Sequence, residues 1–210
     1  MLESSDSFPC WFVEKDQQSG DVAGGVRWLT PSDLPETDGP AVTIAVAYSS
    51  LNFKDALACQ GHRGVVAKLP HVPGVDCAGE VVASDSSDIA VGDQVLVTGY
   101  DLGAARWGGY SGLVRVPASW VVPLGEKLTA KQAMTYGTAG FTAAQCVMAI
   151  VDRVDPDAGD VVVTGATGGV GVFAVAILAK LGYRVTAVTG KVDQAGTLRE
   201  LGATDIVGRE

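Results

Sequence analysis

A cluster of glycines in the last third of the chain has the spacing of a turn that binds phosphate. The segment Val161–Ala179, VVVTGATGGVGVFAVAILA, has no charged residue and four glycines. Glycines let the backbone approach a pyrophosphate closely, and the following helix offers free N–H groups and the positive end of its dipole. The spacing departs from a strict GxGxxG, so a glycine-rich turn of another α/β fold is the alternative. The residues predicted to contact the phosphates are Ala166, Thr167, Gly168, Gly169, Val170 and Gly171.

The end of the next hydrophobic run indicates which dinucleotide the turn would take. Sites for NAD usually place an acidic residue on the ribose about 20 residues after the glycines. Here the run ends Val188-Thr189-Gly190-Lys191, with a hydroxyl and an ammonium group in place of the acid. Both groups suit a 2′-phosphate, so we predict NADPH as the cofactor and Thr189, Gly190 and Lys191 as its contacts. Asp193 is the observation against this choice, and an ordinary surface lysine is the alternative for Lys191.

The residues around the turn alternate between strand and helix patterns. The predicted elements are a strand at 161–164, a helix to about 181, a strand at 184–188, a helix at about 193–201 and a strand at 204–207. This βαβαβ order is half of a doubly wound parallel sheet. An Ala-rich helical segment precedes it, with a capping box of Thr129 and Gln132 and a break at Gly137–Gly140.

The first part of the chain carries strand patterns. Large and small residues alternate with period two in Ala41–Ser50, which predicts a strand. Further short strands are predicted at 79–84, 93–99 and 112–116. Such a series predicts a barrel-like all-β region up to about residue 125. The expected fold class is therefore α/β, with one domain at residues 1–128 and a second at residues 129–210.

The composition argues against several classes of function. The formal net charge of −9 disfavours nucleic acid, whose binding depends on basic surface. Val161–Ala179 is nearly long enough to span a membrane, but its glycines and the lack of aromatic and basic flanks disfavour a span. The start, MLESSDSFPC, lacks the pattern of a signal peptide, and the four cysteines form no CxxC pair. We therefore expect a reduced, cytoplasmic protein.

Six strings in one order carry a resemblance that covers residues 40–208. They are YSSLNFKDAL (48–57), PGVDCAGEV (73–81), GDQVLVTG (92–99), WGGYS (107–111), GTAGFTAA (137–144) and VVTGATGGVG (162–171). Together they resemble the medium-chain dehydrogenase/reductase superfamily, in its acrylyl-CoA reductase branch close to the NADPH quinone oxidoreductases. The resemblance implies an N-terminal GroES-like β-barrel domain followed by a Rossmann domain. Because family members are longer, we expect a fragment that ends within the Rossmann domain, and the resemblance implies a homodimer for the full-length form.

The resemblance also implies a reaction, in which hydride passes from NADPH to the β-carbon of an enoyl thioester such as acrylyl-CoA. Negative charge then develops on the thioester oxygen and needs a fixed donor. Asn52 is the candidate, because an amide donates without changing its protonation state. Asp55 and Asp76 match family positions in the cleft, where they could orient groups or relay protons. The alternative for all three residues is a turn or a cap.

Two threonines are assigned to the cofactor by the resemblance alone. Thr138 and Thr142 match the positions that line the nicotinamide, and hydroxyls that bond back to their own helix turn are the alternative.

No metal site is expected. The place of the zinc-ligand motif of zinc alcohol dehydrogenases reads Gly74-Val75-Asp76, and His71 with Cys77 does not make a zinc site. His62 is interpreted as a loop residue. Arg63 and Lys68 could meet the phosphates of CoA, with a solvated loop as the alternative.

Three functions stay open on the sequence. The first is reduction of an enoyl thioester, the second is reduction of a quinone or enone with the same cofactor, and the third is nucleotide binding without turnover. The glycine turn does not separate the first two, whereas basic residues at the mouth of the substrate pocket would favour CoA. The short chain is the feature that favours the third.

Overall fold

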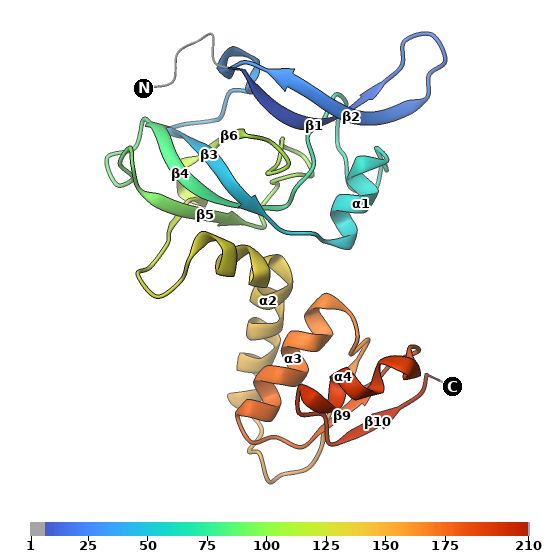
Figure 1. Ribbon diagram of the computed structural model, residues 1–210. Helices are drawn as coiled ribbons and strands as arrows, with labels where there is room; N and C mark the ends of the chain where they lie inside the picture. Colours follow the sequence, from blue (N-terminus) through green and yellow to red (C-terminus); the bar gives the residue numbers. More distant parts are fainter. Residues whose placement is uncertain (1–6, 210) are drawn as a thin grey trace. The chain divides into compact units, whose positions relative to one another are not determined.

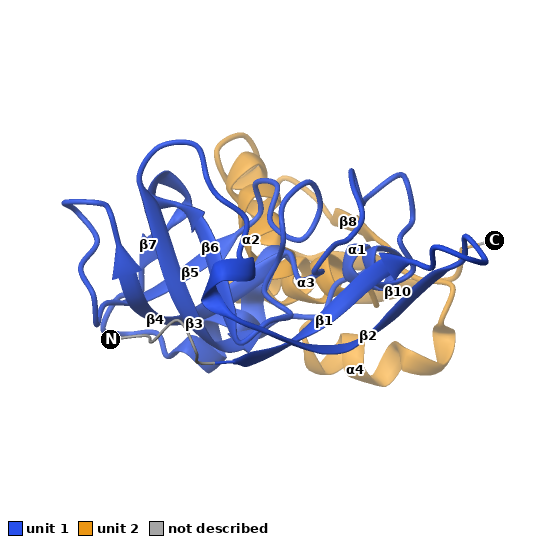
Figure 2. Ribbon diagram, turned by 90° about the horizontal axis from the view of Figure 1, so that it is seen from above, with its two compact units in different colours: residues 1–138 blue, residues 139–210 orange. Residues whose placement is uncertain are grey.

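The computed structural model describes residues 7–209 and divides into two compact units. The N-terminal unit ends at Thr138 and the C-terminal unit begins at Ala139, and Figure 2 colours them separately. The expected division after residue 128 lies earlier, just before helix α2 (Ala130–Val151), which runs through the observed division. The first six residues, on which the expectation of no signal peptide partly depends, lie outside the described range.

A five-stranded antiparallel sheet forms the core of the N-terminal unit. Its order is β6-β3-β4-β5-β7, with bounds β3 Ala41–Ser49, β4 Asp76–Ser84, β5 Gln94–Thr98, β6 Leu113–Pro117 and β7 Val122–Pro123. The period-two pattern of β3 places Val42 and Ile44 in the core with no exposed surface. Burial of side chains of this size stabilises the fold by about 1.5–3 kcal/mol each. The four strands predicted between residues 41 and 116 are confirmed.

A hairpin and a short helix, neither of them predicted, complete this unit (Figure 1). The hairpin consists of β1 (Phe8–Lys15) and β2 (Val22–Leu29), paired antiparallel along their whole length. Helix α1 (Phe53–Cys59) follows β3. A bridge between Val13 and His71 ties β1 to the loop before β4, because the two residues exchange both backbone hydrogen bonds at 2.8 Å. Short 3-10 helices lie at Pro31–Asp33, Ala118–Trp120 and Val192–Gln194.

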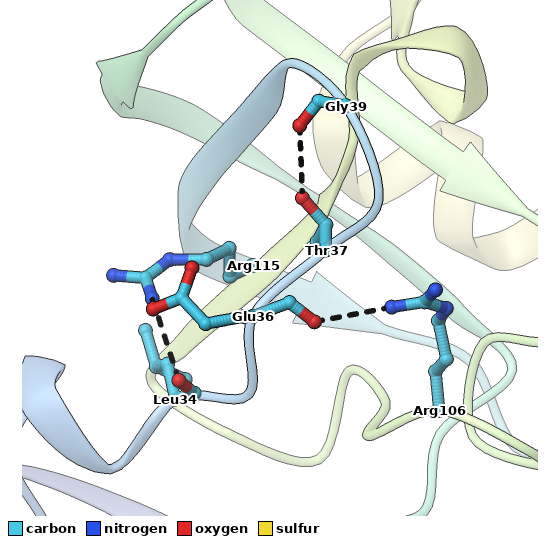
Figure 3. A network of polar contacts seen from close by, with 6 residues as sticks. All are labelled: Leu34, Glu36, Thr37, Gly39, Arg106 and Arg115. Atoms are coloured by element: carbon cyan, nitrogen blue, oxygen red, sulfur yellow. Dashed lines mark hydrogen bonds and ion pairs between the residues drawn. The ribbon is translucent and has the colours of Figure 1, made fainter.

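Two arginines fix the loop that precedes β3 (Figure 3). Arg115 on β6 donates to the carbonyl oxygen of Leu34 at 3.3 Å and pairs with Glu36 at 3.1 Å. Arg106 donates to the carbonyl oxygen of Glu36 at 3.3 Å and pairs with Asp38 at 2.8 Å. Both carboxylates are largely exposed, so each ion pair contributes at most about 1 kcal/mol. The bonds to backbone oxygens are what define the path of the loop.

A three-stranded parallel sheet organises the C-terminal unit. The strand order is β10-β9-β8, with bounds β8 Val161–Thr164, β9 Val185–Val188 and β10 Asp205–Val207. Helices α3 (Gly169–Lys180) and α4 (Ala195–Glu200) connect successive strands. The predicted βαβαβ order and the α/β class are therefore confirmed, and the order matches the first half of a doubly wound sheet.

The uncharged run Val161–Ala179 is divided between a strand and a helix. Val175 and Leu178 of α3 pack against Val185 and Ala187 of β9 in one buried cluster. The hydropathy of the run thus comes from a buried strand and a buried helix with a turn between them. Across residues 7–209, the structure contains no helix with the length and apolar character that a bilayer crossing requires.

Candidate functional site

The carboxylate of Asp76 is the centre of a polar network in the N-terminal unit. Asp76 is the first residue of β4 and has no exposed surface. Its Oδ1 accepts hydrogen bonds from the hydroxyls of Thr98 and Thr138. Its Oδ2 accepts from the Ser50 hydroxyl, from Nδ2 of Asn52 at 3.1 Å and from the backbone N–H of Thr138 at 2.9 Å. A buried carboxylate needs such donors in place of water, and here it joins four segments of the chain.

Gly137 shapes the helix that Asp76 contacts. Its φ of 48° and ψ of −155° interrupt α2, which confirms the predicted break and makes the helix restart at Thr138. A Cβ at position 137 would lie 2.7 Å from Oδ2 of Asp76, so glycine is required there. The first N–H groups of a helix have no partner within it, and a negative charge at that end is favourable. Asp76 therefore caps the helix at Thr138, where it restarts.

Asn52 and Asp55 lie at the start of α1, next to Asp76. Asn52 is the N-cap, and its backbone N–H donates to Oδ2 of Asp55 at 2.8 Å. Asp55 is 1% exposed, and its Oδ1 accepts the N–H of Val75 at 2.9 Å. Nδ2 of Asn52 also reaches Oγ of Ser50 at 2.8 Å and Oδ2 of Asp55 at 3.2 Å. The structure thus places both residues at the N-terminal cap of α1, which is the alternative that the sequence left open, and beside Asp76. Their catalytic roles stay predictions.

Tyr110 closes the network, and sequence reasoning missed it. Its hydroxyl donates to the carbonyl oxygen of Ser50 at 3.0 Å. Burial, and then the negative charge of Asp55, raise the pKa of Tyr110 well above its usual range. The phenol therefore stays protonated and remains a donor at neutral pH. The string WGGYS contains this residue, but nothing in its spacing indicated which backbone oxygen it would meet.

The histidines and the cysteine considered for a metal site each have an environment of their own. Nε2 of His71 is 2.9 Å from the carbonyl oxygen of Gly103, and the His71 side chain is buried. Burial raises the pKa of the Cys77 thiol to about 12, so it stays protonated. His62 is exposed, and its Nδ1 accepts the N–H of Gly64, as expected of a loop residue. Within residues 7–209, no three His, Cys, Asp or Glu side chains are grouped so that they could hold a metal ion.

The glycine turn of the C-terminal unit lies between β8 and α3, as predicted. Gly165 has a φ of 61°, and the N–H of Gly168 donates to its carbonyl oxygen at 2.8 Å. A Cβ at Gly171 would lie 2.7 Å from Cα of Ala166, so the first turn of α3 packs directly on the loop. A cavity of about 440 Å³ adjoins the turn, lined by the glycines 165, 168, 169 and 171 and by β8. Close packing of the helix on the loop that precedes it is one of the features of a dinucleotide-binding glycine turn.

The residues after β9 face this turn. Oγ1 of Thr189 lies 2.9 Å from Oγ1 of Thr167 and accepts the N–H of Lys191 at 3.0 Å. The structure therefore brings the predicted phosphate turn and the predicted 2′-phosphate contacts together at one end of the parallel sheet. Thr142 is half-buried one turn after Thr138 in α2, and its role stays a prediction.

A second cation at this end of the sheet was missed. A Cβ at Gly190 would lie 3.3 Å from Nη2 of Arg209, so the guanidinium group is next to Gly190. Val188 pairs with Val207 in the parallel register of β9 and β10, and the same register continued by two residues sets Gly190 opposite Arg209. That register was the signal that could have found Arg209, had the two predicted strands been aligned.

Comparisons with known proteins agree with these features. Residues 38–126 match the alcohol dehydrogenase GroES-like domain. The chain is 50% identical to the acrylyl-CoA reductase AcuI of Ruegeria pomeroyi over 97% of this chain and 61% of that protein. The predicted resemblance to the acrylyl-CoA reductase branch of the medium-chain dehydrogenase/reductase superfamily is thus confirmed.

Two solved structures have the same fold and carry cofactors. The yhdH oxidoreductase of Salmonella enterica in complex with NADP is 45% identical, with a TM-score of 0.89 over 96% of this chain and 61% of that one. The yhfP protein of Bacillus subtilis with NAD bound is 44% identical, with a TM-score of 0.90 over 98% of this chain and 61% of that one. The chain spans about three-fifths of the length of each of these relatives.

Proposed function

Because the chain carries an alcohol dehydrogenase GroES-like domain and resembles acrylyl-CoA reductases over nearly its whole length, we propose that it is part of an NADPH-dependent reductase of enoyl thioesters. The observation that carries the proposal is the turn between β8 and α3, where the backbone is open to a pyrophosphate and Gly171 lets the helix approach it. The names of the relatives supply the substrate class, a short enoyl-CoA.

The residues of the C-terminal unit fit NADPH rather than NADH. The N–H groups at the start of α3 would hold the pyrophosphate, and the end of β9 would hold the ribose. That end has the hydroxyl of Thr189, the ammonium of Lys191 and the guanidinium of Arg209 next to Gly190. The 2′-phosphate of NADPH pairs favourably with such groups. Sites for NADH usually have a carboxylate that binds the 2′-hydroxyl, and here Thr189 and Lys191 stand at that place. The bound cofactor would supply the hydride.

The residues of the N-terminal unit would fix the substrate oxygen. Nδ2 of Asn52 has two N–H bonds and three acceptors within 3.2 Å. The contact with Asp55, at 3.2 Å, is the longest and is the one that a thioester oxygen can replace. Negative charge on that oxygen would then be met by a donor already held in place. Asp76 acts in this proposal as a positioning residue, because its lone pairs are taken up by five donors.

The experiment is a spectrophotometric assay of NADPH oxidation. Acrylyl-CoA and a benzoquinone are offered in parallel to the 210-residue chain, with NADH as the cofactor control. We expect oxidation that depends on acrylyl-CoA and on NADPH. Oxidation with the quinone alone would assign the chain to the neighbouring quinone reductases. Binding of NADPH without oxidation by either substrate would leave a nucleotide-binding role.

A further inference from the structure

We infer that a basic cavity in the N-terminal unit binds the phosphate groups of the CoA substrate. The cavity has a volume of about 400 Å³ and lies between the tip of the β1–β2 hairpin and the loop that follows α1. Its lining includes three basic side chains, Lys15, Arg63 and Lys68, and no acidic one. This inference rests on the proposed function, because the enoyl-CoA substrate class comes from there.

The three cations are available to a ligand. Lys15, Arg63 and Lys68 are exposed, and none of them forms an ion pair with another described residue. The whole chain has 15 basic and 24 acidic residues. The lining of this cavity, with three unpaired cations, is therefore positively charged, although the chain as a whole is negatively charged. A concave site lined by one sign of charge concentrates ligands of the opposite sign.

The carboxylates that neighbour this cavity in the sequence are directed elsewhere. Glu14 pairs with Arg27, and successive strand residues point to opposite faces, so Glu14 lies on the other face of β1 from Lys15. Asp16 accepts the N–H groups of Gln18 and Ser19 within the hairpin turn. Asp21 follows Gly20 but does not line the cavity. The positive charge of the cavity is thus not cancelled by a carboxylate among its lining residues.

The two walls of the cavity are held in contact. A Cβ at Gly61 would lie 2.5 Å from Cγ1 of Val22, so the loop after α1 packs against the first residue of β2. Val66, which is part of that loop, is buried, and Leu69 is half-buried. The lining therefore combines apolar side chains, two of them buried or half-buried, with three exposed basic ones. Its volume is within the range of small-molecule sites, about 300–1,000 Å³.

The position of the cavity suits a ligand with phosphates at one end and a thioester at the other. Helix α1 begins directly after Asn52 and ends two residues before Gly61. Seven helical residues span about 10 Å at 1.5 Å per residue. The extended arm of CoA separates its phosphates from its thioester by more than this length. The phosphates can therefore occupy the basic cavity while the thioester oxygen lies at Asn52.

The test is calorimetric titration of the 210-residue chain with coenzyme A, 3′-dephospho-CoA and pantetheine. We expect affinity to fall in that order and to weaken with added salt, as for a charged and partly exposed site. The double variant Arg63→Glu/Lys68→Glu should weaken CoA binding at least tenfold and leave pantetheine binding unchanged. Lys127→Glu is the matched control, since it makes the same kind of charge change at an exposed lysine of the same unit that does not line the cavity.

The controls separate this inference from the proposed function. Circular dichroism and thermal unfolding of the double variant, and of the milder Arg63→Gln/Lys68→Gln, establish that each is folded. The affinity for NADPH is measured in every variant and should not change. If NADPH binds, but the parent chain does not bind CoA or the double variant binds it as tightly as the parent, the basic cavity is not the CoA site. Failure of the parent chain to bind NADPH would instead count against the proposed function. In that case, a CoA affinity that depends on Arg63 and Lys68 would still support the cavity as the site for the CoA phosphates.

Discussion

Lys191 and Arg209 are the residues that would decide between NADPH and NADH. Lys191 follows β9, and the guanidinium group of Arg209 is next to Gly190. A hydrogen bond to a charged group contributes about 1.5–3 kcal/mol. Lys191→Ala or Arg209→Ala should therefore weaken NADPH binding about tenfold or more, because 1.4 kcal/mol corresponds to a factor of ten. NADH, which lacks the 2′-phosphate, should bind each variant as it binds the parent.

The measurement is a fluorescence titration of both cofactors. Lys180→Ala is the control, because Lys180 is an exposed lysine of the same unit in the last turn of α3. An equal loss of affinity for NADPH and NADH in the Lys191 or Arg209 variants would contradict recognition of the 2′-phosphate.

His71 gives the stability of the N-terminal unit a dependence on pH. Burial lowers its pKa, and the hydrogen bond with Gly103 only partly opposes this effect. The folded chain therefore binds fewer protons at His71 than the unfolded chain does. The contribution of His71 to the free energy of unfolding is fully present above the pKa of about 6.5 of the unfolded chain. It is lost as the pH falls from there towards the lower pKa of the folded chain.

We predict that His71→Gln flattens this pH dependence. Urea unfolding at about pH 7.5 and about pH 5.5 brackets the ordinary histidine pKa and should show a smaller loss of stability in the variant than in the parent. Exposed His62, changed to Gln, should leave the parent's dependence intact. Parallel losses in His71→Gln and the parent would show that His71 does not titrate as described.

At the scale of elements, Asp76 joins β4 to Thr138 of α2, the last residue of the N-terminal unit. Asp76→Asn keeps the volume of the side chain but replaces one carboxylate oxygen with an NH₂ group. Donors that bond to that oxygen in the parent would then face another donor. Buried donors left without acceptors cost about 1–3 kcal/mol each, so we expect the free energy of unfolding to fall by about 2–4 kcal/mol. Denaturant unfolding measures this change. Asp101→Asn, at an exposed position, should change the free energy of unfolding by about 0.5 kcal/mol or less. An equally small effect of Asp76→Asn would refute the role of Asp76 as the centre of the polar network.

The contact between the glycine turn and α3 predicts a second effect on an element. Gly171→Ala places a Cβ against Ala166 and should displace the start of α3, which lowers both stability and NADPH affinity. Gly196→Ala is a matched control, because nothing lies within 4 Å of a Cβ at that position in α4. Alanine is favoured over glycine in a helix by about 0.5–1 kcal/mol, so the control should be stabilised slightly. Unchanged NADPH affinity in Gly171→Ala would argue against the turn as the pyrophosphate site.

The elements that the sequence predicted were those with strong periodicity. The alternation of Ala41–Ser49 and the buried run Val161–Thr164 identified their strands, and Gly137 marked the interruption of α2. Strand β2 was missed because it contains Gly24 and Gly25 and is mostly exposed, which removes the alternating pattern. Helix α1 was missed because seven residues are too few to show a helical period.

The contacts of the candidate site could be predicted only in part. Asn52, Asp55 and Asp76 were identified as candidates, and the structure brings them together. The hydroxyls of Thr98 and Thr138, however, reach Asp76 across 22 and 62 residues of sequence. Such contacts depend on which strands pair and on which side chain the helix meets where it restarts after Gly137, and no local pattern specifies either partner.

At the scale of the whole molecule, each unit supplies one part of the proposed reaction. The N-terminal unit holds Asn52 and the basic cavity, and the C-terminal unit holds the turn and the cations after β9. Half of a doubly wound sheet is one mononucleotide-binding unit, so the C-terminal unit should hold the adenylate half of the cofactor by itself. The binding of NADPH can therefore be tested on the 210-residue chain.

The most direct test is a side-by-side titration of the 210-residue chain with NADPH and NADH, followed by displacement with adenosine 2′,5′-bisphosphate. We expect saturable NADPH binding, at least about tenfold tighter than that of NADH, given two cations at the 2′-phosphate. We also expect the bisphosphate to displace NADPH, and adenosine 5′-monophosphate not to displace it at the same concentration. Equal affinity for the two cofactors, or no binding of either, would contradict a site for NADPH in this chain.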